Sequence, residues 1–420
     1  MTQPHVEPAA ARDFATDSIL EVANLRKYFP VKSSGLVRRT IGQVQAVDGV
    51  SFRVKRGSAL GLVGESGCGK STTGRLITRL YDPTSGSMKF DGQEIAHLSS
   101  KQMLPLRSEI QMIFQDPYGS LNPRHTVGTI VGTPLRVHKV VPEKKVLPRV
   151  RELLEVVGLN PEHYNRYPNE FSGGQRQRIG LARALALQPK LLVADEPVSA
   201  LDVSIQAQVI NLLQDVQKEF NIAFLFIAHD LAVVRHFCPE VAVMYLGKIV
   251  EVADRDTLYH RPHHPYTQAL LSAVPDVKQA AIGGRRERIR LEGDVPSPIN
   301  PPSGCRFRTR CWMAQDICAR QEPPLLQIDA THKVACHFAG ERGAASTSPI
   351  TLHALGVDQH GSPVNGAEGG TAVGGDESGN PGYSETWKDL ETLRRESAEF
   401  VSATPVSSDG GSAIDGESST

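Results

Sequence analysis

Short apolar segments alternate with longer segments of helical periodicity from about Ile19 to Val274. The short segments are β-prone and predict strands, whereas the longer ones predict helices. Strands are expected at Leu20–Val22, Gln45–Val54, Ala59–Val63, Ile110–Phe114, Leu191–Ala194, Ala223–Ala228 and Val241–Tyr245, with one more after the turn at Gly247. Helices are expected at Ser71–Leu80, Val146–Val157, Gly174–Leu187, Ile205–Phe220 and Asp230–Phe237. This alternation predicts an α/β fold.

Composition changes on both sides of this region. Residues 1–17 are expected to form a flexible leader, and residues 18–275 one α/β domain. Residues 276–342 contain clustered prolines and four cysteines, which predicts a small irregular module. Residues 343–420 hold twelve acidic and three basic residues, a net charge of −9. Such a stretch buries too little apolar surface to offset its ordering entropy, so we expect a disordered acidic tail.

The overall charge and hydropathy restrict the function. The 420 residues include 46 basic and 46 acidic side chains, so no basic excess indicates nucleic-acid binding. No apolar run approaches the ~18 residues that span a bilayer, and the N-terminus lacks a signal-peptide pattern. The chain is therefore expected to stay in the cytoplasm, and any membrane role is expected to be peripheral.

Residues 64–71 read Gly-Glu-Ser-Gly-Cys-Gly-Lys-Ser and match the phosphate-loop pattern G-x-x-x-x-G-K-[ST]. The pattern lies between an expected strand and an expected helix, as its mechanism requires. Its glycines let successive backbone N–H groups face phosphates, and the helix directs its positive end to the same place. We expect Lys70 to reach the β- and γ-phosphates and Ser71 to bind Mg²⁺. Cys68 is interpreted as a small spacer.

Two carboxylates end the apolar strand expected at Leu191–Ala194. A buried strand that delivers Asp195 to its carboxyl end suits a second Mg²⁺ partner opposite Lys70. Glu196 would then lie beside the γ-phosphate, where it is a candidate general base for the attacking water.

Residues 171–178 read Phe-Ser-Gly-Gly-Gln-Arg-Gln-Arg and open a further helix, with Ser172 as a good N-cap. This start is a second anion-binding helix terminus in the chain. Here the sequence resembles the ATP-binding cassette (ABC) family, whose signature is Leu-Ser-Gly-Gly-Gln. Phe171 replaces the leucine, a conservative departure.

Other short motifs of that family follow in order. Gln115 resembles the glutamine loop, Asp202 the D-loop, and His229 the switch histidine. Phe29 lies where the family stacks an aromatic ring on adenine, with Tyr28 as the neighbouring candidate. The resemblance implies catalytic roles for Lys70, Glu196 and His229, and Mg²⁺ contacts for Ser71, Gln115 and Asp195. It implies nucleotide contacts for Phe29, Gly64, Glu65, Ser66, Gly67, Cys68, Gly69, Lys70, Ser71, Thr72, Gln115, Ser172, Gly173, Gly174, Gln175 and Asp202.

The resemblance also implies an architecture. It implies a P-loop ABC ATPase core at 18–275 with a helical subdomain at about 117–187. In this family the signature of one subunit closes over the nucleotide held by another, so Ser172 and Gly174 are expected to act in trans. ATP binding would then close a two-state interface that hydrolysis releases.

The flanking segments resemble the ATPase subunits of bacterial oligopeptide and dipeptide importers. These segments are Phe29–Val47, Gln115–Arg124, His264–Pro275 and Gly293–Cys305. The resemblance implies a homologous but different ATPase chain as partner, two membrane permeases, a peptide-binding protein and a place on the cytoplasmic face of the membrane. The family range includes nickel importers, and a soluble ABC ATPase not coupled to transport is a further alternative.

Cys305, Cys311, Cys318 and Cys336 are the four cysteines of the C-terminal module. Their thiolates could hold zinc or an iron–sulfur cluster, although no C-x₂-C pair is present. The resemblance to peptide-importer ATPases implies a [4Fe–4S] site, with zinc and unligated thiols as alternatives. The interleaved Arg306, Arg308 and Arg310 either offset thiolate charge or form a solvated basic loop. Cys238 is expected to be a buried apolar residue.

Overall fold

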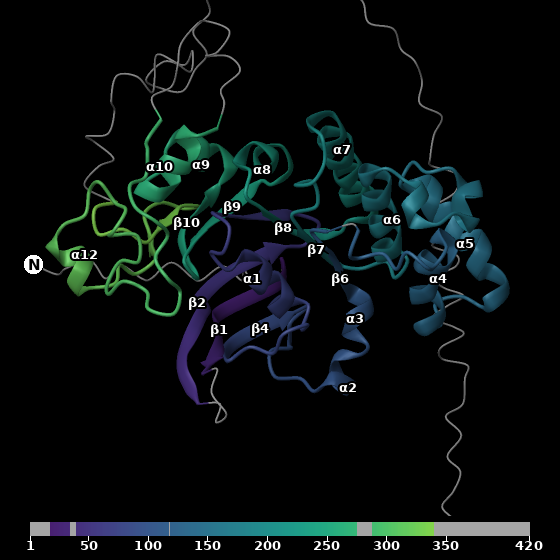
Figure 1. The fold of residues 1–420 in the computed structure, drawn as a ribbon, viewed down its shortest axis with the longest axis horizontal. Coiled ribbons are helices and arrows are strands. Elements are labelled where there is room, and N and C mark those ends of the chain that lie inside the picture. The colour runs from purple at the N-terminus through teal and green to yellow at the C-terminus, as the bar shows by residue number, and fades with distance from the viewer. Residues whose placement is uncertain (1–16, 34–38, 117, 275–287, 340–420) are drawn as a thin grey trace, which may run out of the picture.

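The computed structural model describes residues 17–33, 39–116, 118–274 and 288–339. The expected acidic tail, nearly all of the expected leader and the expected boundary at residue 275 lie outside the described residues. Two sheets and the helices around them form the described part of the chain (Figure 1).

The larger sheet has eight strands in the order β11-β12-β10-β9-β3-β8-β7-β6. Five of them are parallel, namely β9 (Glu240–Tyr245), β3 (Ala59–Val63), β8 (Ala223–Ala228), β7 (Leu191–Asp195) and β6 (Ile110–Ile113). Every residue of β3, β7 and β8 is buried, because layers cover both faces of this sheet. The strands expected there from uniformly apolar segments are confirmed.

The second sheet is antiparallel, in the order β2-β1-β4-β5. It contains β1 (Ser18–Lys32), β2 (Thr40–Lys55), β4 (Ser85–Phe90) and β5 (Gln93–Glu94). The strand expected at Leu20–Val22 was too short, because β1 continues through half-exposed positions that carry no uniform apolar signal. Its pairing with β2 extends to Lys32 and Thr40, so the segment after Phe29 begins as a continuation of the two-stranded ribbon.

Helix α1 (Lys70–Ile77) packs between the two sheets, and its Leu76 and Ile77 are fully buried in a core that both sheets share (Figure 1). The helix ends earlier than Leu80, because Arg79 adopts a positive φ of 54° and closes the last turn.

A helical region lies at one end of the molecule (Figure 1). It contains α4 (Val127–Val137), α5 (Glu143–Val156), the short 3₁₀ turns Pro161–Asn165 and Pro168–Glu170, and α6 (Gly173–Leu185). The sequence did not predict α4, because two glycines, two threonines and Pro134 weaken its helical signal. These elements match the helical subdomain expected at about 117–187.

Further helices cover the large sheet. They are α7 (Val203–Phe220), α8 (Leu231–Phe237), α9 (Arg255–His260) and α10 (Pro265–Ser272), while the short α2 (Ser100–Met103) and α3 (Leu106–Glu109) precede β6. Of these, only α7 and α8 were predicted. No helix in the described ranges has both the length and the apolar character to cross a membrane.

Residues 288–339 join the large sheet through two short strands and lie at the end opposite the helical region (Figure 1). Strand β12 (Lys333–Val334) pairs antiparallel with β10 (Lys248–Asp254), and β11 (Leu326–Gln327) pairs with β12. The short helix α12 (Asp316–Arg320) lies among the loops that precede them. The cysteine-bearing module is thus irregular, as expected, and is also continuous with the ATPase-like sheet.

Candidate functional site

The phosphate loop connects β3 to α1, as the sequence predicts. Gly64 and Gly69 have φ values of 154° and 109°, in the region that favours glycine. A Cβ at Gly64 would lie 2.1 Å from the Met244 carbonyl oxygen, and one at Gly69 would lie 2.1 Å from that of Ala46. Neighbouring backbone therefore encloses the loop so closely that only glycine fits at these two positions.

The side chains of Lys70 and Ser71 lie where the motif predicts. Lys70 is buried, and its Nζ donates hydrogen bonds to the carbonyl oxygens of Gly64 at 2.8 Å and Glu65 at 3.0 Å. Ser71 Oγ donates to Asp195 Oδ1 at 2.8 Å, which joins the phosphate loop to the end of β7. A cationic group and a hydroxyl–carboxylate pair are therefore assembled at the mouth of one loop.

The Ser71–Asp195 pair has the chemistry of a Mg²⁺ site. Both groups supply oxygen ligands, which this cation prefers. Burial raises the pKa of Asp195, although the hydrogen bond from Ser71 opposes that shift. A buried carboxylate whose negative charge is poorly solvated gains from an adjacent cation, so these residues fit the expected metal.

Glu196 is the centre of a second group of side chains. Its Oε2 accepts a hydrogen bond from Gln115 Nε2 at 3.0 Å and lies 3.1 Å from His229 Nδ1. The three residues come from the ends of β6, β7 and β8, which are neighbours in the sheet. Three motifs that the sequence could only place in order along the chain thus meet at one oxygen. Gln115 was expected to bind Mg²⁺; here its amide contacts Glu196, and the Mg²⁺ contact stays a prediction.

The backbone of Glu196 is strained. Its φ is 46°, a region that non-glycine residues rarely adopt, and its N–H donates to the Ile227 carbonyl at 2.9 Å. Strain of this kind persists where the surrounding structure fixes it, and it concentrates at functional sites.

The signature residues lie apart from these two groups. Ser172 and Gln175 form a reciprocal capping box at the start of α6, with Ser172 N donating to Gln175 Oε1 at 3.0 Å. Gly173 lies beside Leu201, and a Cβ on Gly174 would lie 2.5 Å from Ile205 Cγ2. Helix α6 lies well away from α1 in Figure 1. The signature therefore packs against the start of α7, and the single chain does not bring it to its own phosphate loop.

Asp202 is the N-cap residue of α7 and is exposed, as is Ser172. Its side chain makes no cap hydrogen bond. The two predicted half-site segments thus present their polar residues on the surface.

Phe29 is half-buried on β1 and packs edge-on against Tyr81, with ring centroids 5.5 Å apart. Lys27 Nζ lies 5.1 Å from the centre of the same ring. Tyr28 instead donates its hydroxyl to Asp48, and burial together with that bond raises its pKa to about 12. Of the two aromatic candidates, Phe29 has the apolar ring, whereas the polar group of Tyr28 is already bonded to Asp48.

Two contacts to the phosphate loop were not expected from the sequence. The Glu65 carboxylate forms an ion pair with Arg310, and the Glu65 N–H donates to the Tyr266 hydroxyl at 2.8 Å. These partners are 245 and 201 residues away along the chain. Tyr266 lies in the segment His264–Pro275 that resembles the importer family, but neither that resemblance nor a local motif at Arg310 points to the phosphate loop. Cys68 is buried as expected of a spacer, and burial raises the pKa of its thiol.

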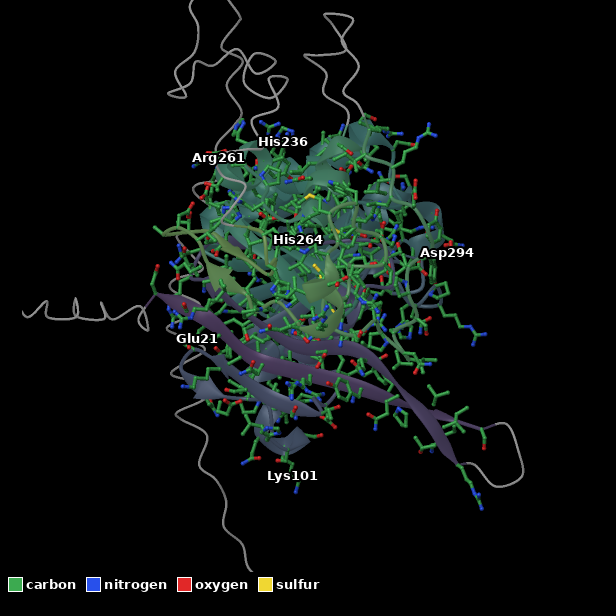
Figure 2. All side chains as sticks on the ribbon, turned by 90° about the vertical axis from the view of Figure 1, so that its left-hand side faces the viewer. Glu21, Lys101, His236, Arg261, His264 and Asp294 are labelled. Atoms are coloured by element: carbon green, nitrogen blue, oxygen red, sulfur yellow. The ribbon has the colours of Figure 1, made fainter. Side chains whose placement is uncertain are left out.

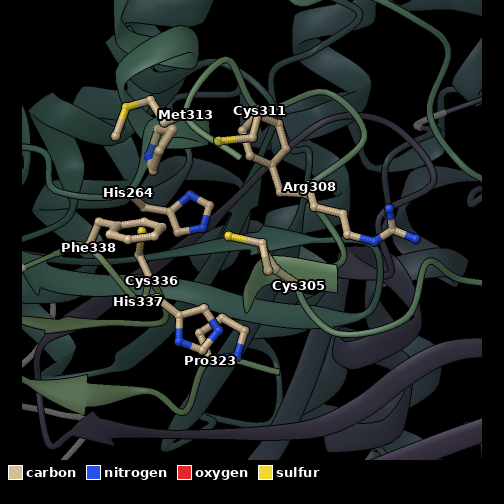
Figure 3. Close-up of a pocket in the computed structure, with 12 residues that line it drawn as sticks. His264, Cys305, Arg308, Cys311, Met313, Pro323, Cys336, His337 and Phe338 are labelled. Carbon is tan, nitrogen blue, oxygen red and sulfur yellow. The ribbon is translucent and has the colours of Figure 1, made fainter. Parts of the chain in front are cut away.

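The four C-terminal cysteines line one small cavity of about 20 Å³ (Figure 3). Cys305, Cys311 and Cys336 surround it together with His264, and Cys318 completes the set. Burial raises the pKa of Cys305 to about 11, and the charges of the other three cysteines act in the same direction. Burial and the neighbouring cysteines therefore favour the protonated form of the Cys305 thiol.

This arrangement does not support the expected [4Fe–4S] cluster. Within the described ranges, no three His, Cys, Asp or Glu side chains are placed to share a metal ion. The four cysteines share a cavity, but they are not arranged as a set of metal ligands. Cys238 is fully buried, as expected.

For Arg306 and Arg310, neither expected role is correct: offset of thiolate charge or a place in a solvated basic loop. Arg306 is buried and binds Asp48 and the Leu246 carbonyl, and Arg310 binds Glu65. Their charges are directed to partners in the ATPase-like core, so they neither offset thiolates nor form a solvated loop.

Comparisons with known proteins agree with this geometry. A family model described as ABC transporter matches residues 47–199, and one described as oligopeptide/dipeptide transporter, C-terminal region, matches residues 250–318. The oligopeptide transport ATP-binding protein AppF of Bacillus subtilis (strain 168) is 55% identical over 323 residues, which are 77% of this chain and 98% of AppF.

Two solved structures share the fold. The first is cbiO1 from Clostridium perfringens, part of the ABC transporter complex cbiONQ, with a TM-score of 0.51, 29% identity and coverage of 58% of this chain and 92% of that chain. The second is a dimeric post-hydrolysis structure of the ATP-binding cassette MJ0796 bound to ADP and Pi, with a TM-score of 0.50, 27% identity and coverage of 56% and 98%. The expected α/β cassette fold is confirmed.

Proposed function

The chain belongs to the ABC transporter family, and we propose that it is the subunit that hydrolyses ATP to drive import of dipeptides and oligopeptides across the cytoplasmic membrane. The observation that supports this most strongly is the 55% identity to an oligopeptide transport ATP-binding protein over nearly its whole length. The match of residues 250–318 to the oligopeptide/dipeptide transporter C-terminal region supports the same substrate class.

The assembled side chains support a division of labour at the nucleotide. Lys70, now bonded to the loop carbonyls, would turn to the β- and γ-phosphates when ATP is bound. Ser71 and Asp195 would hold Mg²⁺, which neutralises phosphate charge when bound. Glu196 would accept the proton of the attacking water, while Gln115 and His229 hold its carboxylate in place.

The exposed signature and D-loop residues support a two-chain site. Ser172 and Asp202 would contact the nucleotide bound to a partner cassette, because both lie on the surface and the helix that Ser172 caps lies apart from its own phosphate loop (Figure 1). We infer that the partner is a homologous but different ATPase chain. The complete assembly would add two permeases and an extracytoplasmic peptide-binding protein, with this chain on the cytoplasmic face of the membrane.

The four cysteines have no step in this proposal. Their described arrangement offers no set of three metal ligands, so we derive no chemistry from a cluster or a zinc ion at that cavity.

The test is peptide uptake by the reconstituted transporter. Proteoliposomes that contain this chain with its partner cassette, permeases and binding protein should accumulate labelled tripeptide only with internal Mg·ATP. Glu196→Gln should keep ATP binding and lower uptake and ATPase turnover by about 100-fold or more. Uptake of Ni²⁺ without peptide would contradict the substrate class, and ATPase activity that no permease alters would favour a cassette not coupled to transport.

A further inference from the structure

The segment between Cys305 and Cys311 reaches back to the phosphate loop. Arg310 Nη1 lies 2.7 Å from Glu65 Oε2, and Arg310 Nη2 lies 3.2 Å from Glu65 Oε1. Each terminal guanidinium nitrogen therefore donates to a different carboxylate oxygen, which makes the pair bidentate. The Arg310 side chain is only 8% exposed and that of Glu65 is 29% exposed, so water screens the pair only in part.

Glu65 is an unfavourable residue for the place it occupies. It is the first variable residue of the phosphate loop, whose backbone N–H groups and Lys70 serve a polyanion. A negative side chain there would repel the phosphates, and the repulsion is strong where the surroundings are poorly solvated. Within the described ranges, Arg310 is the cationic side chain bonded to this carboxylate.

The position of Arg310 is fixed from two sides. Phe307 packs against Tyr245 and Tyr266, with ring centroids 5.2 and 5.4 Å apart. Arg306 donates to the Leu246 carbonyl at 2.6 Å, in the turn between β9 and β10. The segment that carries Arg310 is therefore anchored to the core beside the loop.

The same anchor reaches the loop backbone. The Tyr266 hydroxyl accepts from the Glu65 N–H, and the Gly247 N–H donates to the Cys68 carbonyl at 2.8 Å. These two contacts come from elements that pack against the Arg310 segment. The charge of the Glu65 side chain and the backbone position of the phosphate loop thus both depend on the Arg310 segment and the elements packed against it, which are distant in sequence.

We propose that Arg310 is a positioning residue for nucleotide binding, because it neutralises Glu65 and fixes that carboxylate against the C-terminal segment. This inference rests on the proposed ATPase function. It assigns a part of the cysteine-bearing C-terminal region to the nucleotide site itself.

The test compares charge with packing at this pair in the full-length chain. Arg310→Gln should raise the dissociation constant for Mg·ATP, and the KM of the assembled transporter for ATP, about fivefold or more, with a smaller effect on kcat. Arg310→Lys keeps the positive charge but cannot form the bidentate pair, so its loss should be clearly smaller than that of Arg310→Gln. Arg308→Gln is the matched control, because it removes an equal charge from the same segment, where Arg308 binds Ser303 instead.

A double variant separates an effect of charge from an effect of packing. If the unpaired Glu65 charge causes the loss, then Arg310→Gln should have little effect in a Glu65→Gln background. Equal losses in both backgrounds, or a loss in Arg310→Lys as large as in Arg310→Gln, would overturn the proposal. Thermal unfolding of each variant shows whether the fold is retained. A wild-type chain that does not bind ATP would instead overturn the proposed function.

Discussion

A single carboxylate oxygen organises the residues proposed for catalysis. Glu196 Oε2 is shared by Gln115 and His229, and the glutamate backbone is held at a positive φ. Two partners and a strained backbone fix this side chain. Its reorganisation energy on accepting a proton is therefore small. We therefore propose that His229 orients Glu196.

His229→Ala should therefore lower kcat far more than it raises KM. We expect a loss of about 100-fold in kcat, in the range that one positioned acid–base group contributes. Steady-state ATPase kinetics of the assembled transporter would measure it. His236→Ala is the control, because His236 lies at the periphery of the molecule (Figure 2) on the last turn of α8. Equal effects on kcat and KM would contradict the orienting role.

The sequence showed most of these residues but not their partners. Lys70, Ser71 and Asp195 belong to short motifs whose spacing is set by a strand and a turn, so the sequence alone predicts where they meet. The Glu65–Arg310 pair has no such signal. Glu65 and Arg310 meet because the segment that carries Arg310 is anchored to the core through Arg306 and Phe307, and patterns in a single sequence do not reveal such a long-range contact.

At the scale of elements, residues at the starts of helices have both structural and proposed functional roles. Ser172 caps α6 through its reciprocal bonds with Gln175, and the same residue is proposed to contact a partner's nucleotide. The cap satisfies backbone N–H groups that would otherwise be orphaned. The hydroxyl group of Ser172 therefore has both a structural role, as a helix cap, and a proposed functional role.

Ser172→Ala should show how much the cap contributes to stability. Loss of the cap should lower the free energy of unfolding by about 1 kcal/mol, measured by urea denaturation. Ser172→Asn keeps a good capping group and should retain most of that stability. If the two variants were equally stable, the capping box would not be a significant contributor in solution.

Asp254 caps α9 and ties it to the C-terminal region. Its carboxylate accepts bonds from the Thr257 N–H and from Thr331 Oγ1. Partial burial opposes ionisation, but the bonds from Thr257 and Thr331 outweigh it and lower the pKa from 3.8 to about 2. The ionised form is thus favoured by folding.

This shift predicts how stability changes in acid. A depressed pKa contributes stability that is present above pH 3.8 and is lost as pH falls to about 2. Asp254→Asn should be less stable than the wild type at pH 7, and the difference should vanish near pH 2 in unfolding measurements. Asp256→Asn, at the exposed neighbour that pairs with Arg255, should show a much smaller change. A gap between wild type and Asp254→Asn that did not depend on pH would contradict the shift.

Elements were predictable where burial is uniform. Strands β3, β7 and β8 are buried at every position, so an apolar run marks them closely. Helix α4 was missed because its residues have poor helix propensity, which its packing against the other helices of the helical region outweighs. Helices α9 and α10 have six and eight residues and were missed, although α1 and α8 are equally short and were predicted, so periodicity over so few residues is not a dependable signal.

At the scale of the molecule, the C-terminal region completes the core instead of adding a separate lobe. It extends the large sheet through β12 and contributes Phe307 to the same apolar cluster as β8 and β9. The family match for that region also begins at residue 250, inside β10. A composition change at residue 276 could not reveal this continuity, because sheet pairing joins segments regardless of composition.

The exposed residues at the start of α7 lead to a prediction about assembly. Val203 directly follows Asp202 and is 81% exposed, an apolar side chain beside a proposed nucleotide contact. If two cassettes close over ATP, this surface is buried, and a charge placed there would be desolvated without a partner. In the Glu196→Gln background, which should retain ATP, Val203→Glu should weaken Mg·ATP-dependent dimerisation about tenfold or more. Sedimentation of the chain alone and with its partner cassette would measure this. Val137→Glu, 69% exposed at the end of α4, should leave dimerisation intact; equal losses in both variants would show that the surface at α7 has no special part in closing the site.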